Sequence, residues 1–434
     1  MRGSSLLGCF VGSLVVVSNA VAAEEMPPVP ETGETAAAPS MGERPPAPVS
    51  DLTAPPQPPV IGTVAPATAT PPSFRVEGAG GSSIRVGILL QPQFMAASSA
   101  GTTTRDGYSQ NLYIRRARIL LGGTLLGAFE YFIDTDYPNL FRANNVAGAA
   151  GAPATAVKDT PGMNIQDAFG TWKAFKDFLK LDVGYMLPSL AHNAVQGATS
   201  LYSWDYFTYS FQHSANGVFT TSATSVGRDV GAQARGLLVD GHLEYRAGLF
   251  QGRRDGQTAT EVAAHNFFRF AARLQINLLD PETGFFYQGS YLGSKKVVSL
   301  GGAMDIQDTY KYFAGDVFVD LPLAGVGVLT AQVNYAHWNG GSFIPELTRQ
   351  QAIMGEAGFL VSEIQLSPIV RYEHLWGSNN GTQNLPDETR YIAGLAYWPF
   401  GHNSNLKAFY SRIHTVGAAR DTNQFNVQWQ LFVY

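Results

Sequence analysis

A cluster of arginines gives this chain its highest local density of positive charge. Arg115, Arg116 and Arg118 lie close together, and residues two apart on a strand share a face. Arg116 and Arg118 are therefore expected on one face, with Arg115 on the other. Further arginines occupy the polar face of other alternating segments: Arg246, Arg269, Arg273 and Arg371. If these polar faces border a narrow passage, the guanidinium groups of Arg116, Arg118, Arg246, Arg269, Arg273 and Arg371 would attract anions to it.

Carboxylates recur on the same polar faces as these arginines. The set comprises Glu130, Asp134, Asp136, Asp182, Asp316 and Asp320. Two interpretations stay open: an arginine-dominated wall that selects anions, or mutual neutralisation with little selectivity. The formal net charge of −5 does not decide between them, although it argues against nucleic acid as a partner.

The segment 184–211 combines Pro188 with a dense row of aromatic and acidic side chains. The residues of interest are Tyr202, Trp204, Asp205 and Tyr206. Folded into a pore, they would form a constriction whose rings stack on sugars or aromatic solutes. Placed at the membrane boundary, the same rings would form an aromatic belt. The composition favours the belt.

Motifs of known catalytic or cofactor sites are absent from the sequence. It has no HExxH, GxSxG, phosphate-binding-loop or calcium-loop pattern. His192 and His213, together with Asp205 and nearby serines, could in principle form a hydrolase site, but their spacing is not specific for one. We therefore expect no enzymatic activity, cofactor or metal, and keep two alternatives to a pore: a β-barrel hydrolase and a secreted β-rich glycan-binding protein.

The elements that position these residues are predicted to be strands. Apolar and polar residues alternate with a period of two from Ile84 onward, which is typical of β-structure. Such segments begin near Ile84, Leu112, Phe129, Ile165, Leu179, Asp229, Leu243, Phe267, Phe285, Lys296, Lys311, Val328, Ile353, Ile364, Glu388, Asn405 and Gln424. If the first and the last strand of a barrel both end on the periplasmic side, the number of strands must be even, so we expect sixteen strands.

The connections between these segments differ in length. Short links such as 399–404 alternate with long ones such as 187–228 and 338–353. Outer-membrane barrels have short periplasmic turns and long surface loops, and this alternation predicts such a barrel. The fold class is therefore all-β, a transmembrane antiparallel barrel.

The N-terminal residues indicate export. Residues 1–23 read as a signal peptide, with Arg2 before an apolar stretch and small residues at 20–23. Cleavage would remove Cys9, the only cysteine, and leave a thiol-free chain suited to an oxidising periplasm. Residues 24–73 are rich in paired prolines, so we expect a disordered periplasmic linker before a barrel domain at 74–434.

The composition agrees with membrane residence by strands. Only 15% of residues are charged, below the roughly 25% of soluble domains, and the chain holds 46 Gly, 19 Tyr and 26 Phe. The last segment, 424–434, places Phe425 and Trp429 on one face, whereas Phe432 and Tyr434 fall on the polar face. Its register therefore stays open, and we expect this strand to present the signal for the barrel-assembly machinery.

An ordered set of short motifs resembles the phosphate-selective porin family of Gram-negative outer membranes, the porin O and P type. The motifs are YIRRARI at 113–119, FEY at 129–131, VG at 183–184 before LP at 187–188, YRAGLFQG at 245–252, AR at 272–273, LSPIVRY at 366–372 and GLAY at 394–397. The resemblance covers about 84–434.

This resemblance implies a sixteen-stranded, trimeric barrel with arginines in the lumen and an inward-folded third loop. The arginine role carries over to Arg116, Arg118 and Arg273, where the motifs match. Family members that select phosphate use lysines and arginines near the constriction, whereas 187–212 contains neither. We therefore expect a general pore for small solutes in the outer membrane, weakly selective for anions and without tight phosphate binding.

Overall fold

The computed structural model describes residues 73–98, 108–146, 155–158, 162–211, 213–214, 217–218, 227–253, 267–379 and 384–434. The expected signal peptide and almost all of the expected linker, 24–73, lie outside these residues. No helix within the described ranges is long and apolar enough to cross a membrane.

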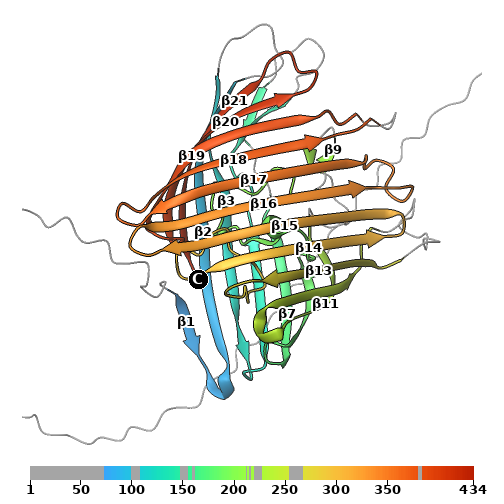
Figure 1. Ribbon diagram of the computed structural model, residues 1–434, viewed down its shortest axis with the longest axis vertical. Coiled ribbons are helices and arrows are strands. Elements are labelled where there is room, and N and C mark those ends of the chain that lie inside the picture. The colour runs from blue at the N-terminus through green and yellow to red at the C-terminus, as the bar shows by residue number, and fades with distance from the viewer. Residues whose placement is uncertain are drawn as a thin grey trace, which may run out of the picture. The chain divides into compact units, whose positions relative to one another are not determined.

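Sixteen antiparallel strands form a closed barrel (Figure 1). They are β2 (Ser83–Ser98), β3 (Tyr108–Leu125), β4 (Phe129–Asp136), β7 (Asn164–Phe175), β8 (Leu179–Met186), β11 (Asp229–Leu238), β12 (Leu243–Phe250), β13 (Arg269–Asn277), β14 (Val297–Gln307), β15 (Tyr310–Leu323), β16 (Gly327–Asn339), β17 (Gln350–Val361), β18 (Leu366–Trp376), β19 (Glu388–Phe400), β20 (Ser404–Thr415) and β21 (Thr422–Val433). The predicted fold class and strand number are confirmed.

Small elements accompany the barrel. They are the strands β1 (Phe74–Glu77), β5 (Ala143–Val146), β6 (Thr155–Lys158), β9 (His213–Ser214) and β10 (Gly217–Val218), and the 3-10 turns η1 (Ala79–Gly81), η2 (His192–Val195) and η3 (Val239–Gly241). β5 pairs with β6 and β9 pairs with β10. β1 pairs with the first residues of β2 and makes the main sheet seventeen-stranded.

The barrel closes where the first and last wall strands meet. β2 pairs with β3 along one side and with β21 along the other, with Ile88 opposite Val433. Closure matters because a backbone in lipid must satisfy its hydrogen bonds internally, and a closed sheet has no free edge. The end that holds Ser83 and Tyr434 is called the terminal end here, and the opposite end the loop end.

The strands alternate between an apolar outer face and a polar inner face. On β15, Asp316 and Asp320 are buried inside, while Val317 between them is exposed outside. Aromatic residues gather on the outer face near both ends: Tyr372, Trp376 and Tyr391 toward the loop end, and Phe129, Trp172 and Phe400 toward the terminal end. Such belts are typical of barrels that span a membrane.

One predicted strand is absent from the wall. The segment near Phe285 lies in the connection 278–296 between β13 and β14, and it enters the barrel from the terminal end. Other terminal-end connections are short, for example 324–326 and 401–403. The other sixteen candidate positions all fall in or beside wall strands. The stretch around Phe285 is aromatic and about as long as a strand, but its apolar and polar residues do not alternate over that length.

The facing of Arg115 differs from the prediction. The register of β2 and β3 pairs Gln91 with Arg116 and the next residue, Pro92, with Ile114, so Arg115 is an extra residue in a β-bulge. A bulge reverses the simple alternation on its strand. Arg115 and Arg116 therefore both reach into the lumen, and the expectation that they point to opposite faces is wrong.

The last strand keeps one register to its end. Phe432 and Tyr434 lie on the inner face with the polar residues of β21, where both pack in a cluster with Leu89, Leu120 and Phe132. Gly87 makes this possible, because a Cβ there would lie 2.7 Å from the Cβ of Tyr434. Tyr434 therefore packs on the inner face of the barrel, where β2 and β21 meet.

Candidate solute pathway

Two inserts enter the lumen from opposite ends. The loop insert, 187–211, follows β8, and the terminal insert, 278–296, links β13 and β14. Pro188, Tyr202 and Tyr206 all belong to the loop insert, and Tyr202 is only 1% exposed. Its ring stacks on Trp398 of β19 at 6.1 Å, and Trp204 packs on Phe409 of β20 at 4.9 Å. These aromatics lie inside the barrel, so the membrane-belt interpretation of 184–211 is wrong.

Asp205 anchors the tip of the loop insert. Its carboxylate accepts hydrogen bonds from Nε of Arg115 at 2.8 Å and from Nη2 of Arg116 at 2.5 Å. Burial alone would raise the pKa of Asp205, but the two guanidinium groups hold it below its ordinary value. Asp205 therefore links the loop insert to β3 through two ion pairs.

Other cations of the wall bind the backbone of the same tip. Arg371 on β18 donates to the carbonyl oxygens of Asp205 at 2.9 Å and Tyr206 at 3.1 Å. Lys407 on β20 donates to the carbonyl oxygens of Leu201 at 2.6 Å and Ser203 at 3.0 Å. The wall therefore uses its positive charges to hold the insert in place.

The two inserts contact each other in the middle of the lumen. The amide of Gly197 donates to the carbonyl of Tyr287 at 2.9 Å, and the amide of Tyr287 donates to Val195 at 3.1 Å. His192 Nε2 lies 2.9 Å from Glu282 Oε2, and both side chains are fully buried. Residues from both ends of the barrel thus form one packed body.

Arg246 and Arg273 lie against this body. Both guanidinium groups lie over the ring of Tyr287, at 4.4 Å and 5.2 Å from its centroid. Arg246 also donates to the carbonyl of Phe285 at 2.6 Å and pairs with Glu244 at 2.7 Å. Arg273 pairs with Asp316 at 2.7 Å. These arginines therefore hold the terminal insert in place, and each also pairs with a carboxylate that balances its charge.

Most of the remaining predicted wall residues are also paired with opposite charges, including Asp182 with Arg235 at 2.8 Å, whereas Asp320 accepts hydrogen bonds from the Thr330 hydroxyl and the Tyr291 amide. Arg118 binds Asp134 and Asp136, each at 2.9 Å. The other pairs are Arg269 with Asp305 at 2.6 Å, Arg371 with Glu356 at 2.7 Å, and Glu130 with Lys173 at 3.1 Å. The six predicted arginines are all at most 9% exposed. The structure places the whole predicted set on the inner face, and their effect on selectivity stays a prediction.

Comparison with known proteins rests on the fold, since no family model and no curated protein matches the chain. OmpF of Salmonella typhi, in complex with daunomycin, is 14% identical over 82% of this chain and 100% of its own, with a TM-score of 0.50. The anion-selective porin of Comamonas acidovorans is 12% identical over 81% of this chain and 99% of its own, with a TM-score of 0.51. The barrel has the porin fold.

Sequence reasoning missed several residues of the porin-fold interior. Arg115, Lys407, His192 and Glu282 all hold the inserts, and none was singled out as a pore residue. Pro281 interrupts the stretch around Glu282, with further breaks at Gly284, Gly289 and Gly293. Such residues are unfavourable inside a strand, and they were the available signal that 278–296 is a connection.

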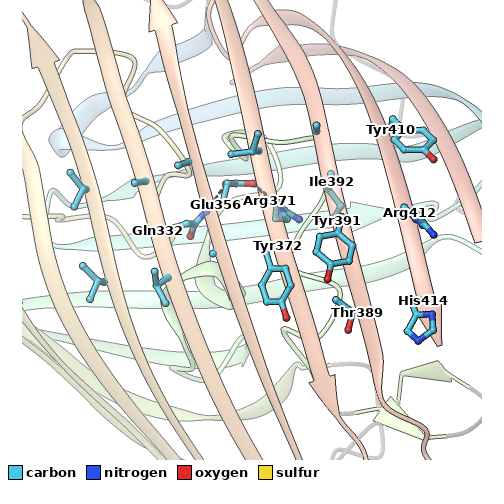
Figure 2. A pocket seen from close by; sticks show the side chains of 18 of the residues that line it. Gln332, Glu356, Arg371, Tyr372, Thr389, Tyr391, Ile392, Tyr410, Arg412 and His414 are labelled. Carbon is cyan, nitrogen blue, oxygen red and sulfur yellow. Dashed lines mark hydrogen bonds and ion pairs between the residues drawn. The ribbon is translucent and has the colours of Figure 1, made fainter. Parts of the chain in front are cut away.

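Two hollows accompany the described part of the porin fold. One, of about 1000 Å³, lies on the outer wall of β15 to β20, where Tyr372, Tyr391 and Tyr410 border it (Figure 2). The pair of Arg371 and Glu356 lies behind it, on the inner side of the wall. The other, of about 870 Å³, is at the terminal end of the lumen beneath the inserts, and we call it the vestibule.

Proposed function

We propose that this chain is an outer-membrane porin, a water-filled channel through which small solutes diffuse. The observation that carries the proposal is the closed barrel, apolar outside and charged inside, with two inserts narrowing its lumen. The terminal end faces the periplasm, because short turns dominate there and outer-membrane barrels place short turns on that side. The protein assembles as a homotrimer, and β21 serves its insertion by the barrel-assembly machinery.

The channel prefers anions only weakly. Each predicted arginine has a carboxylate partner, so their fields largely cancel. Within the described part of the chain, Lys407 has no carboxylate partner and donates to carbonyl oxygens instead. Phosphate passes without tight binding, because the cations near the loop insert already hold its backbone and Asp205.

Planar-bilayer recording with reversal potentials tests the proposal. Insertion of the detergent-purified protein should produce discrete conductance steps. Under a salt gradient, the reversal potential should be small and its sign should indicate a preference for anions. Micromolar phosphate should leave the chloride current unchanged. Absence of steps from protein that shows the heat-dependent gel mobility of a folded barrel would contradict channel function, and a micromolar phosphate block would contradict weak binding.

A further inference from the structure

The vestibule contains an arc of aromatic rings. Phe285 stacks on Phe169 with centroids 4.3 Å apart and meets Phe286 edge-on at 4.8 Å. Phe286 contacts Phe132 at 5.9 Å, and Phe132 contacts Tyr434 at the same distance. The rings of Phe132, Phe285, Phe286 and Tyr434 are only partly buried, and all four line the hollow. The arc therefore offers aromatic surface to a solute.

A guanidinium group lies at each end of the arc. Arg85 lies over the ring of Tyr434 at 5.0 Å, and Arg235 lies over Phe285 at 5.5 Å. Both arginines also line the vestibule. A molecule that covers the rings would thus meet a positive charge at the edge of the arc.

The two ends differ in charge. Arg235 is paired with Asp182 at 2.8 Å, so its charge is compensated within the wall. Among the described residues, Arg85 makes no salt bridge, and its contact with Tyr434 leaves its donors available. The other charged groups that line the vestibule are paired: Arg75 with Glu77 at 2.5 Å, Lys180 with Asp177 at 2.8 Å, and Glu130 with Lys173 at 3.1 Å. One uncompensated cation therefore remains beside the arc.

We propose that the vestibule binds small aromatic monocarboxylates, with the ring on Phe132 and Phe286 and the carboxylate on Arg85. Arginine suits a carboxylate because its planar fork can donate two parallel hydrogen bonds. Aromatic rings in edge-on or offset contact stabilise a bound ring beyond its burial. The volume of about 870 Å³ admits such a solute together with water. A dicarboxylate gains less, since the second guanidinium is already neutralised.

The site deepens the proposed porin function, and equilibrium binding can test it without any conduction. The probe is 4-fluorobenzoate, followed by fluorine NMR on the folded protein in detergent. We expect saturable binding with a dissociation constant on the order of 1 mM, since a wet and open site holds ligands weakly. Fluoroacetate, which lacks the ring, and 4-fluorobenzylamine, which carries the opposite charge, should not compete for the site.

Two variants locate the site. Arg85→Gln should weaken 4-fluorobenzoate binding about tenfold or more, as expected for loss of a charged hydrogen-bond donor. Phe286→Leu should weaken it as well, by removal of the stacking face. Arg412→Gln is the matched control, because Arg412 is an exposed arginine on the outer wall and should leave binding unchanged. Heat-dependent gel mobility establishes that each variant is folded.

The outcomes separate the two proposals. Binding lost in both vestibule variants and kept in Arg412→Gln supports the site, even if the bilayer shows no conductance. A conducting channel with no saturable binding, or with equal binding in all variants, would overturn the site and leave the porin proposal standing. If either vestibule variant fails to fold, the other decides the question.

Discussion

His192 and Glu282 form a fully buried pair, 2.9 Å apart, that joins the two inserts of the barrel. His192 belongs to the loop insert, and its ring lies between Tyr287 at 4.7 Å and Phe318 at 4.4 Å. Glu282 belongs to the terminal insert and also accepts hydrogen bonds from Gln275 and Tyr291. The narrowed part of the lumen is therefore formed by both inserts together, one from each end of the barrel.

Replacing Glu282 by Gln should loosen this junction. The amide keeps the shape but removes the charge and one acceptor, which costs about 1–3 kcal/mol where donors are left unsatisfied. We expect a larger and noisier single-channel conductance, together with faster hydrogen exchange in 278–296. Glu346→Gln is the matched control, since Glu346 is half-exposed in a loop-end connection. Identical conductance in the two variants would show that the junction does not limit the pore.

The same junction should weaken in acid. Burial would raise the pKa of Glu282, but His192 and the hydrogen bonds to the carboxylate hold it below its ordinary value. A carboxyl group with a depressed pKa contributes its stability above its unfolded pKa of about 4.3 and loses it as pH falls through the folded value. We expect constant conductance between about pH 7 and 5 and noisier channels below about pH 4. Glu282→Gln should change less over the same range, and an equal change in both proteins would point to other groups.

Asp205→Asn should affect both stability and selectivity. Arg115 and Arg116 would lose their shared counter-charge inside the lumen. Because the Asp205 side chain is 22% exposed, the cost should fall below the roughly 3–5 kcal/mol of breaking a fully buried pair. The freed positive charge should shift the reversal potential further toward anions. Asp421→Asn serves as the control, because Asp421 pairs with the exposed Arg412 on the outer wall. An unchanged reversal potential would mean that Asp205 is remote from the ion path.

Ile119→Arg should impair assembly of the barrel. Ile119 is 57% exposed on the outer face of β3, between inward-facing Arg118 and Leu120. An arginine there costs about 2–4 kcal/mol near the bilayer midplane and less toward the interfaces. Ile119→Val should fold normally. Folding yield into lipid vesicles measures the difference, and equal yields would place Ile119 outside the membrane.

The sequence predicted the wall far better than the lumen. Strand alternation is local, so residues such as Ile119 and Asp316 could be assigned a face from their neighbours alone. The bulge at Arg115 depends on pairing with β2, which no local pattern reveals. The partners His192 and Glu282 are 90 positions apart, and their meeting depends on two inserts folding inward. Long-range contacts of this kind are set by tertiary packing and not by periodicity.

A cysteine pair between the inserts tests the joint constriction most directly. A Cβ added at Gly197 would lie 3.7 Å from the Cβ of Phe286, close to the spacing of about 3.8 Å in disulfides. Cys9 is the only native cysteine and lies in the expected signal peptide. In Gly197→Cys with Phe286→Cys, we predict a disulfide in the folded barrel, detected as a linked peptide by mass spectrometry, and a conductance that does not change on reduction. Gly197→Cys with Phe400→Cys, whose second position lies on the outer face, should remain unlinked. Free thiols in the first pair within folded, membrane-inserted protein would contradict the account, because the two inserts would then not meet in the lumen.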